Sequence, residues 1–137
     1  GQLLQSQDNT ETTISSESFG SISLSQAITP SATSSKVLIM GYVQFFIDNN
    51  NQDKGLGLRI RRDSTAIQTS TTHYDAYRKT VPGQDRFADR FPFMYIDSPS
   101  SSSQITYSIR ISALNNLAVK INHNANFSQI QCWEILA

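Results

Sequence analysis

The segment that decides the fold is residues 35–47, SKVLIMGYVQFFI, which is apolar or aromatic at nearly every position from Val37 to Ile47. Only Gly41 and Gln44 interrupt the run, one at an odd position and one at an even position. Successive side chains of a β-strand point to opposite faces of the sheet, so a strand with one solvent-facing side alternates apolar and polar residues. This segment does not alternate, and we therefore predict a strand that is covered on both faces.

The size and composition of the chain indicate one domain suited to an extracellular or virion surface. Its 137 residues match a single domain, 1–137, in which residues 1–20 are a candidate N-terminal edge strand or arm. Hydrophobic residues make up 38% and charged residues 16% of the chain, below the usual values of roughly 45–50% and 25%. The chain begins with glycine, which is consistent with excision from a longer protein or with processing.

The charge balance argues against two classes of partner. Lysine and arginine together number 11, as do aspartate and glutamate, so the formal net charge is zero. A neutral chain offers no electrostatic basis for binding nucleic acid or an anionic membrane surface. No segment approaches the roughly 18–20 apolar residues of a membrane span, and no signal peptide is visible. We expect no nucleic-acid partner and no membrane insertion.

Hydrophobic periodicity predicts an all-β chain. No stretch has helical periodicity, whereas short alternating or continuously apolar runs recur between turn residues. Because no βαβ alternation appears, we predict an antiparallel two-sheet jelly-roll sandwich of about nine or ten strands, with the aromatic run broken at Pro92. The candidate strands lie at 2–7, 21–28, 35–47, 55–62, 65–69, 86–96, 104–112, 117–121 and 128–136, and 11–19 and 73–79 are candidates for further short strands.

The two runs at 104–112 and 117–121 are close enough in sequence to form a hairpin. A two-residue turn at Asn115-Asn116 would place Ile111 opposite Lys120 and mix the two faces. A three-residue connection or a bulge places Ile111 opposite Ile121 and keeps the apolar residues together. We predict the second arrangement.

The residues that could support catalysis or hold a metal are few. Cys132 is the only cysteine, so there is no internal disulfide, and its apolar neighbours indicate a packed side chain. His73 and Asp75 could form a pair, but no nucleophile motif accompanies them. The stretch that begins at Asp48 lacks the glycine and the final acid of a calcium loop. We predict no catalytic residue, no metal site and no cofactor.

Four segments, read in order, resemble a family of small C-terminal domains in structural proteins of tailed phages and marine viruses, often fibres or other virion appendages. The resemblance covers nearly the whole chain, although each motif alone is short. The segments are 28–40 (ITPSATSSKVLIM), 61–67 (RRDSTAI), 93–107 (FMYIDSPSSSSQITY) and 130–136 (IQCWEIL).

The resemblance implies a jelly roll like tumour necrosis factor, assembled as a homotrimer with one sheet around the threefold axis. It implies a location on the virion surface, contact with other virion proteins and a role in host attachment, and it brings no catalytic residues. Residues 71–85 depart from the family pattern, so we place specificity in this segment. The candidate binding residues for a host surface glycan or protein are Tyr74, Asp75, Tyr77 and Arg78.

A trimer also explains the segment at 35–47. One of its faces would be buried inside the sandwich and the other between protomers. The odd set is Val37, Ile39, Val43 and Phe45, and the candidate interface or core residues are Leu38, Met40, Tyr42, Gln44, Phe46 and Trp133.

Two other functions remain open from the sequence. One is a purely structural trimerisation or capsid-decorating domain without a ligand. The other is a glycan depolymerase, which would need paired acids in a groove. The only crowded acids are Asp75, Asp85 and Asp89, and these alternate with arginines, so we predict that the protein is not an enzyme.

Overall fold

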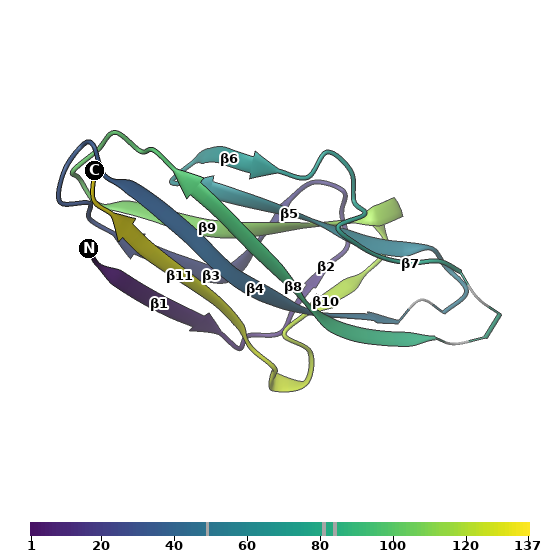
Figure 1. The fold of residues 1–137 in the computed structure, drawn as a ribbon. Helices are drawn as coiled ribbons and strands as arrows, with labels where there is room; N and C mark the ends of the chain where they lie inside the picture. The colour runs from purple at the N-terminus through teal and green to yellow at the C-terminus, as the bar shows by residue number, and fades with distance from the viewer. Residues whose placement is uncertain (49, 81, 84) are drawn as a thin grey trace.

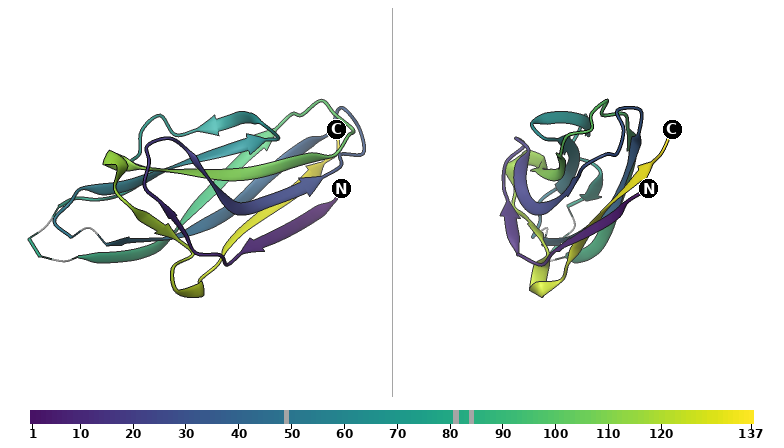
Figure 2. Two further views of the ribbon diagram at one scale, coloured as in Figure 1. Left: turned by 180° about the vertical axis from the view of Figure 1, so that it is seen from behind. Right: turned by 90° about the vertical axis from the view of Figure 1, so that its left-hand side faces the viewer.

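The computed structural model describes residues 1–48, 50–80, 82–83 and 85–137. These residues form β-strands and two short 3-10 helices, arranged as two antiparallel sheets packed face to face (Figure 1; Figure 2). The strands are β1 (Leu3–Asp8), β2 (Thr12–Ile14), β3 (Gly20–Ile28), β4 (Lys36–Asp48), β5 (Lys54–Arg62), β6 (Thr65–Thr69), β7 (Ala76–Arg78), β8 (Arg86–Asp97), β9 (Ile105–Ala113), β10 (Val119–Ile121) and β11 (Ser128–Ile135), and the helices are η1 (Leu114–Asn116) and η2 (His123–Ala125).

Sheet A contains six strands built around β4, the strand predicted from the opening segment. β8 pairs with β4 along its whole length on one side. On the other side β11 pairs with the first half of β4 and β10 with the second, and β1 and β2 form the outer edges. β8 continues through Pro92, so the predicted break is wrong. β8 is an edge strand, and a proline without an N–H is tolerated there.

Sheet B contains five strands and lies across the core from sheet A. β9 and β5 are its centre, with β3 beside β9, and with β6 and β7 both beside β5. All pairings in both sheets are antiparallel, which confirms the predicted fold class. The described residues form eleven strands, where the sequence predicted nine or ten.

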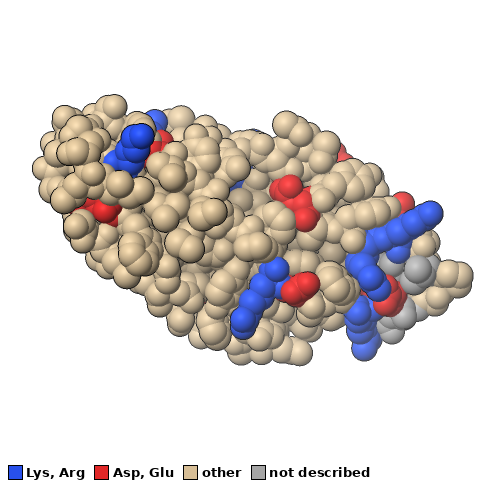
Figure 3. All heavy atoms as spheres, viewed as in Figure 1, with Lys and Arg blue, Asp and Glu red and all other residues tan. Residues whose placement is uncertain are grey.

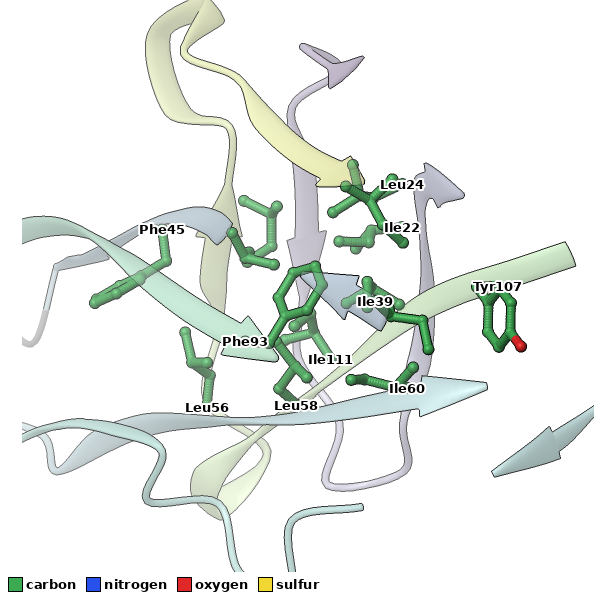
Figure 4. Close-up of a cluster of buried hydrophobic side chains, with 14 of the residues drawn as sticks. Ile22, Leu24, Ile39, Phe45, Leu56, Leu58, Ile60, Phe93, Tyr107 and Ile111 are labelled. Atoms are coloured by element: carbon green, nitrogen blue, oxygen red, sulfur yellow. The ribbon is translucent and has the colours of Figure 1, made fainter. Parts of the chain in front are cut away.

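The core lies between the two sheets and is made of their inward-facing apolar side chains. The odd residues of β4, from Val37 to Ile47, point into it and are at most 3% exposed apart from Gly41. Figure 4 shows Ile39 of β4 and Phe93 of β8 meeting Ile60 of β5 and Ile111 of β9. The inward side chains of β3, β5 and β9 lie at alternate positions, as expected for strands with one face on the core.

The predicted hairpin between 104–112 and 117–121 is wrong. β9 belongs to sheet B and β10 to sheet A, where Lys120 pairs with Phe46. The chain crosses between the sheets through η1, with Asn115 and Asn116 at φ values of 57° and 56°. Ile111 and Ile121 are both fully buried because each sheet turns one apolar face to the same core. A crossing and a hairpin thus give the same pattern of inward residues.

A buried polar cluster joins the two sheets at one end. Arg62 of β5 donates from Nη1 to both carboxylate oxygens of Asp97 of β8 at 2.8 Å, and the Tyr107 hydroxyl of β9 donates to Asp97 at 2.7 Å. Burial, followed by the Asp97 carboxylate, raises the pKa of Tyr107, so the phenol stays protonated as a donor. Two of the motif segments, 61–67 and 93–107, meet in this cluster.

A second polar cluster holds the N-terminal residues against β11 of sheet A. Glu134 of β11 is 7% exposed, and its carboxylate accepts hydrogen bonds from the Ser31 N–H (2.6 Å), the Ser31 hydroxyl (2.7 Å) and the Gln2 amide (3.0 Å). The bonds from Ser31, which are the largest cause, lower the Glu134 pKa from 4.5 to about 2. Glu134 therefore fastens both β1 and the 29–35 loop to β11.

The close approach of β11 to β4 predicts a strong effect at Gly41. A methyl group there would overlap the carbonyl oxygen of Gln129 and lie 2.9 Å from Phe93 Cζ. We expect Gly41→Ala to lower the free energy of unfolding by about 3 kcal/mol, at the upper end of overpacking costs. Gly20→Ala is the control, because its nearest atom is a flexible one, Ile14 Cδ1 at 3.3 Å. Chemical denaturation measures both, and equal losses would contradict the steric explanation.

The Glu134 cluster predicts a specific pH dependence. The folded-state pKa lies below the unfolded value of 4.5, so the ionised carboxylate stabilises the fold above about pH 4.5. This contribution is lost as the pH falls from 4.5 to about 2. We expect Glu134→Gln to be less stable than the wild type at pH 7 and the gap to close across that window. Denaturant unfolding at a series of pH values measures the gap, and a gap independent of pH would contradict the assignment.

Candidate functional site

The outward surface of sheet A is the first candidate for a functional surface. We define the A-face as the outward side chains of neighbouring strands β1, β11, β4 and β8. In an antiparallel sheet, residues directly opposite one another share a face. The A-face residues are Leu3, Gln5 and Gln7 of β1, Gln129, Gln131 and Trp133 of β11, Leu38, Met40 and Tyr42 of β4, and Pro92, Met94 and Ile96 of β8.

Strand register arranges the A-face in three rows that run across the sheet. The first row is entirely apolar, the second has two glutamines and two methionines, and the third has two glutamines beside tyrosine and proline. Not one of these residues carries a charge. The large apolar side chains at the outer positions are well exposed: Leu3 50%, Trp133 42%, Met94 65% and Ile96 55%.

The centre of the A-face is hollowed. A depression of about 520 Å³ is lined mainly by Met40, Tyr42, Pro92, Met94 and Gln131. In Figure 3, which views this side of the molecule, charged side chains are most crowded at the right-hand end, a smaller group lies at the left-hand end, and uncharged residues cover most of the surface between them. The A-face is therefore a broad neutral surface with an apolar floor.

The second half of the outward face of β4 is covered by the chain itself. Gln44 is buried, its side-chain oxygen accepts from the His123 N–H at 2.9 Å, and its backbone N–H donates to Ser128 at 2.9 Å. The His123 ring stacks on Phe46, with ring centroids 4.0 Å apart. Residues 122–128 thus cover Gln44 and Phe46. The other predicted interface residues, Leu38, Met40, Tyr42 and Trp133, belong to the A-face.

Tyr42 lies at the border between the covered and open halves. The Arg90 guanidinium is 4.8 Å from the centre of the Tyr42 ring, and the Phe127 ring is 6.2 Å away. These contacts fix the ring in place while one edge still lines the depression. This division could not be predicted from the sequence, because the covering residues follow more than seventy positions after Gln44.

The predicted ligand-binding residues around β7 separate into two kinds. Tyr74 and Tyr77 form an exposed pair, 55% and 38% accessible, with ring centroids 4.9 Å apart. Asp75 instead accepts a hydrogen bond from the Leu58 N–H at 2.8 Å and holds the segment against β5. Arg78 pairs with Asp85 and lies over the Phe87 ring at 5.0 Å. The last residues of this segment include positions 81 and 84, which lie outside the described residues.

His73 has polar partners that the sequence did not reveal. Its Nδ1 lies 2.7 Å from the Ser112 hydroxyl, and its Nε2 lies 3.9 Å from Glu17. This order of serine, histidine and acid has the composition of a catalytic triad. Ser112 is fully buried, however, so a substrate cannot reach its hydroxyl. The cluster instead anchors the segment before β7 to sheet B.

The remaining reactive groups give no catalytic constellation in the described part of the chain. Cys132 is fully buried, and burial raises the pKa of its thiol to about 12, so it stays a neutral packed side chain. Among the described residues no three histidine, cysteine, aspartate or glutamate side chains are grouped as metal ligands. The described part of the chain also has no helix that is long and apolar enough to span a membrane.

Comparison with known proteins finds similarity of fold and no match of sequence. No family model matches the sequence, and no curated protein matches it. The structure is similar to a solved chain of the infectious bursal disease virus VP2 subviral particle, with a TM-score of 0.51 and 11% identity, covering 99% of this chain and 37% of that one.

Two further structures of the same virus also match. These are the T13 viral particle (TM-score 0.49, 13% identity, 99% and 36% coverage) and the Gx strain (TM-score 0.43, 14% identity, 100% and 38% coverage). The chain spans little more than a third of the length of these solved chains. At such low identity the first similarity shows the fold alone, an all-β antiparallel sandwich of two sheets.

Proposed function

We propose that this chain is a structural domain of a virion surface that assembles with copies of itself as a homotrimer through the A-face. The observation that carries the proposal is the neutral, apolar A-face, which extends over four strands. Soluble monomers rarely expose a contiguous apolar patch of more than a few hundred Å². The viral capsid fold and the family resemblance support a place on a particle, as a fibre head or a decoration domain.

A second copy of the chain is the occupant that suits the A-face best. A charged partner surface would lose solvation against a face that offers it no opposite charge. Two A-faces meet without like-charge repulsion, and the glutamine side chains both donate and accept hydrogen bonds. Interfaces of permanent oligomers resemble a domain core cut in half. Leu38, Met40 and Trp133 are large apolar side chains of the kind found in such a core.

The assembly predicts that one charge in the A-face blocks it. We expect wild-type protein at micromolar concentration to have three times the 15.3 kDa chain mass by light scattering. Met94→Glu should give monomers, because burying an unpaired carboxylate at an interface costs about 2 kcal/mol or more. Ser23→Glu, which adds the same charge at an exposed strand position of sheet B, should stay trimeric. A monomeric wild type, or equal effects of both variants, would contradict the proposal.

A second role, host attachment, is favoured by one specific observation. Tyr74, just before β7, and Tyr77, within it, present an exposed aromatic pair. Aromatic side chains that combine an apolar ring with a polar tip are enriched at interfaces, and such a pair offers a platform for sugar rings or apolar groups of a host protein. Asp75 and Arg78 then support the platform, since both are held within the chain.

The aromatic pair predicts a loss of binding that depends on the ring. On an array of host-type glycans, or on host cells, Tyr74→Ala and Tyr77→Ala should abolish binding by removing the stacking surface. Tyr77→Phe is the matched control and should bind as the wild type does. Binding that survives both alanine variants would exclude the aromatic pair as the site, and absence of binding by the wild type would favour the purely structural role. In that case removing the domain would weaken the particle and leave adsorption unchanged.

A further inference from the structure

The outward surface of sheet B carries a cluster of arginines that neither assembly nor the aromatic pair explains. Arg59 and Arg61 of β5 alternate with buried Leu58 and Ile60, and Arg110 of β9 lies between two buried isoleucines. The three arginines therefore point outward on adjacent strands. We define the B-face as Arg59, Arg61 and Arg110 together with the hydroxyl residues Ser21, Ser108 and Thr69 opposite them.

Strand register brings the positive charges directly together. Arg59 lies opposite Arg110 in the β5–β9 pair, and Arg61 lies opposite Ser108, one diagonal step from Arg110. Side chains directly opposite one another on antiparallel strands have Cβ atoms about 4.5–5.5 Å apart, and like charges at that spacing destabilise the sheet. The chain has 11 acidic residues, yet none of them lies opposite these arginines in the strand pairs of sheet B.

The acids nearest in sequence and register already have other partners. Glu17 accepts a hydrogen bond from the Asn115 N–H at 3.0 Å and contacts His73. Asp63 accepts from the Thr106 N–H at 2.9 Å, and Asp75 accepts from the Leu58 N–H. Within the described residues, the three arginines form no ion pair with any of them.

Arg59 is also held in a fixed position. Its guanidinium carbon lies 4.1 Å from the centre of the Phe19 ring, which packs near His73 at 6.3 Å. Its Nε is buried without a hydrogen-bond partner among the described groups. An arginine fixed by an aromatic ring loses little conformational entropy when it binds a ligand.

We propose that Arg59, Arg61 and Arg110 form a binding site for the sulfate or carboxylate groups of an acidic polysaccharide. Guanidinium groups bind such oxyanions through two parallel hydrogen bonds, and the anion would relieve the repulsion between the facing arginines. The neighbouring serine and threonine hydroxyls suit the hydroxyls of a sugar. The B-face lies on the opposite side of the sandwich from the A-face, so assembly through the A-face leaves it open.

Nucleic acid fits this site less well than an acidic polysaccharide. Proteins that bind nucleic acid through the backbone commonly neutralise about six to ten phosphates. The B-face offers three arginines on a chain with zero net charge. A short, locally charged site surrounded by hydroxyls matches a polymer with isolated anionic groups and many neutral sugar hydroxyls.

Titration calorimetry with dextran sulfate and uncharged dextran tests the proposal on the full chain. Wild type should bind dextran sulfate and not dextran. Arg110→Gln and Arg61→Gln should each weaken binding about tenfold or more, as expected for the loss of a charge-assisted hydrogen bond. Arg86→Gln, which removes the same charge from β8 in sheet A, should change binding less than twofold. A carboxylated dextran distinguishes carboxylate from sulfate as the preferred group.

Thermal unfolding is a second measurement, and it distinguishes ligand binding by Arg110 from a purely structural role of that residue. Without ligand, Arg110→Gln should melt at a higher temperature than wild type, because it removes one of two facing charges. With dextran sulfate the wild type should gain stability and the variant should not. Equal binding by wild type and Arg110→Gln, equal loss in Arg86→Gln, or tighter binding of a single-stranded oligonucleotide would overturn the proposal. None of these results depends on whether the protein is a trimer.

Discussion

The apolar character of both faces of β4 is the constraint on which the rest of the structure depends. The inward face, from Val37 to Ile47, is covered by sheet B and supplies much of the core. The two halves of the outward face have different surroundings. The half that contains Gln44 and Phe46 is covered by residues 122–128, and the half that contains Leu38 and Met40 forms the floor of the A-face. The sandwich therefore covers the inward face and half of the outward face of this strand, and the rest of the outward face stays half-buried at the surface of the chain.

The residues that carry the family resemblance act as structural ties between distant parts of the chain. Asp97 accepts from Arg62 and Tyr107 and so joins the sheets at one end. Glu134 joins the N-terminus and the 29–35 loop to the last strand. Buried polar clusters of this kind are stable when every member is hydrogen-bonded, and they fix the relation between elements that apolar packing leaves free to slide. They explain the motifs without any catalytic role.

Periodicity predicted the parts of the fold that depend on one strand at a time. The inward faces of β3, β5 and β9 follow directly from alternation, whereas β4 is apolar on both sides and its sequence did not say which side faces the core. The partners of each strand do not follow from alternation, because a hairpin and a crossing to the other sheet bury the same residues, as Ile111 and Ile121 show. The same limit applies to Pro92, whose tolerance depends on β8 being an edge strand.

The candidate sites show the same limit: exposure can be predicted from the local sequence, whereas partners on distant segments cannot. Exposed aromatic residues in a polar segment correctly suggested that Tyr74 and Tyr77 stand out from the surface. The charged neighbours Asp75 and Arg78 looked equally available, yet their partners Leu58 and Asp85 lie on other segments and tie them down. The pairing of Arg59 with Arg110 on the B-face could not be predicted for the same reason. The two residues are 51 positions apart in the sequence and are adjacent only through the register of β5 and β9.

The two outward faces of the sandwich differ in a way that a lone monomer would not need. The A-face is neutral and apolar, and the B-face gathers three arginines whose repulsion the chain does not compensate. Each arrangement costs stability or solubility in isolation, and each cost disappears when a particular surface or ion is supplied. Burying the A-face against copies of the chain turns every B-face outward. Several weak anion sites then act together on one polymer, and linking binding modules in this way raises apparent affinity by roughly 10²–10⁴ without a new contact. A three-arginine site that binds weakly in one chain would therefore bind the same polymer more tightly in the proposed assembly.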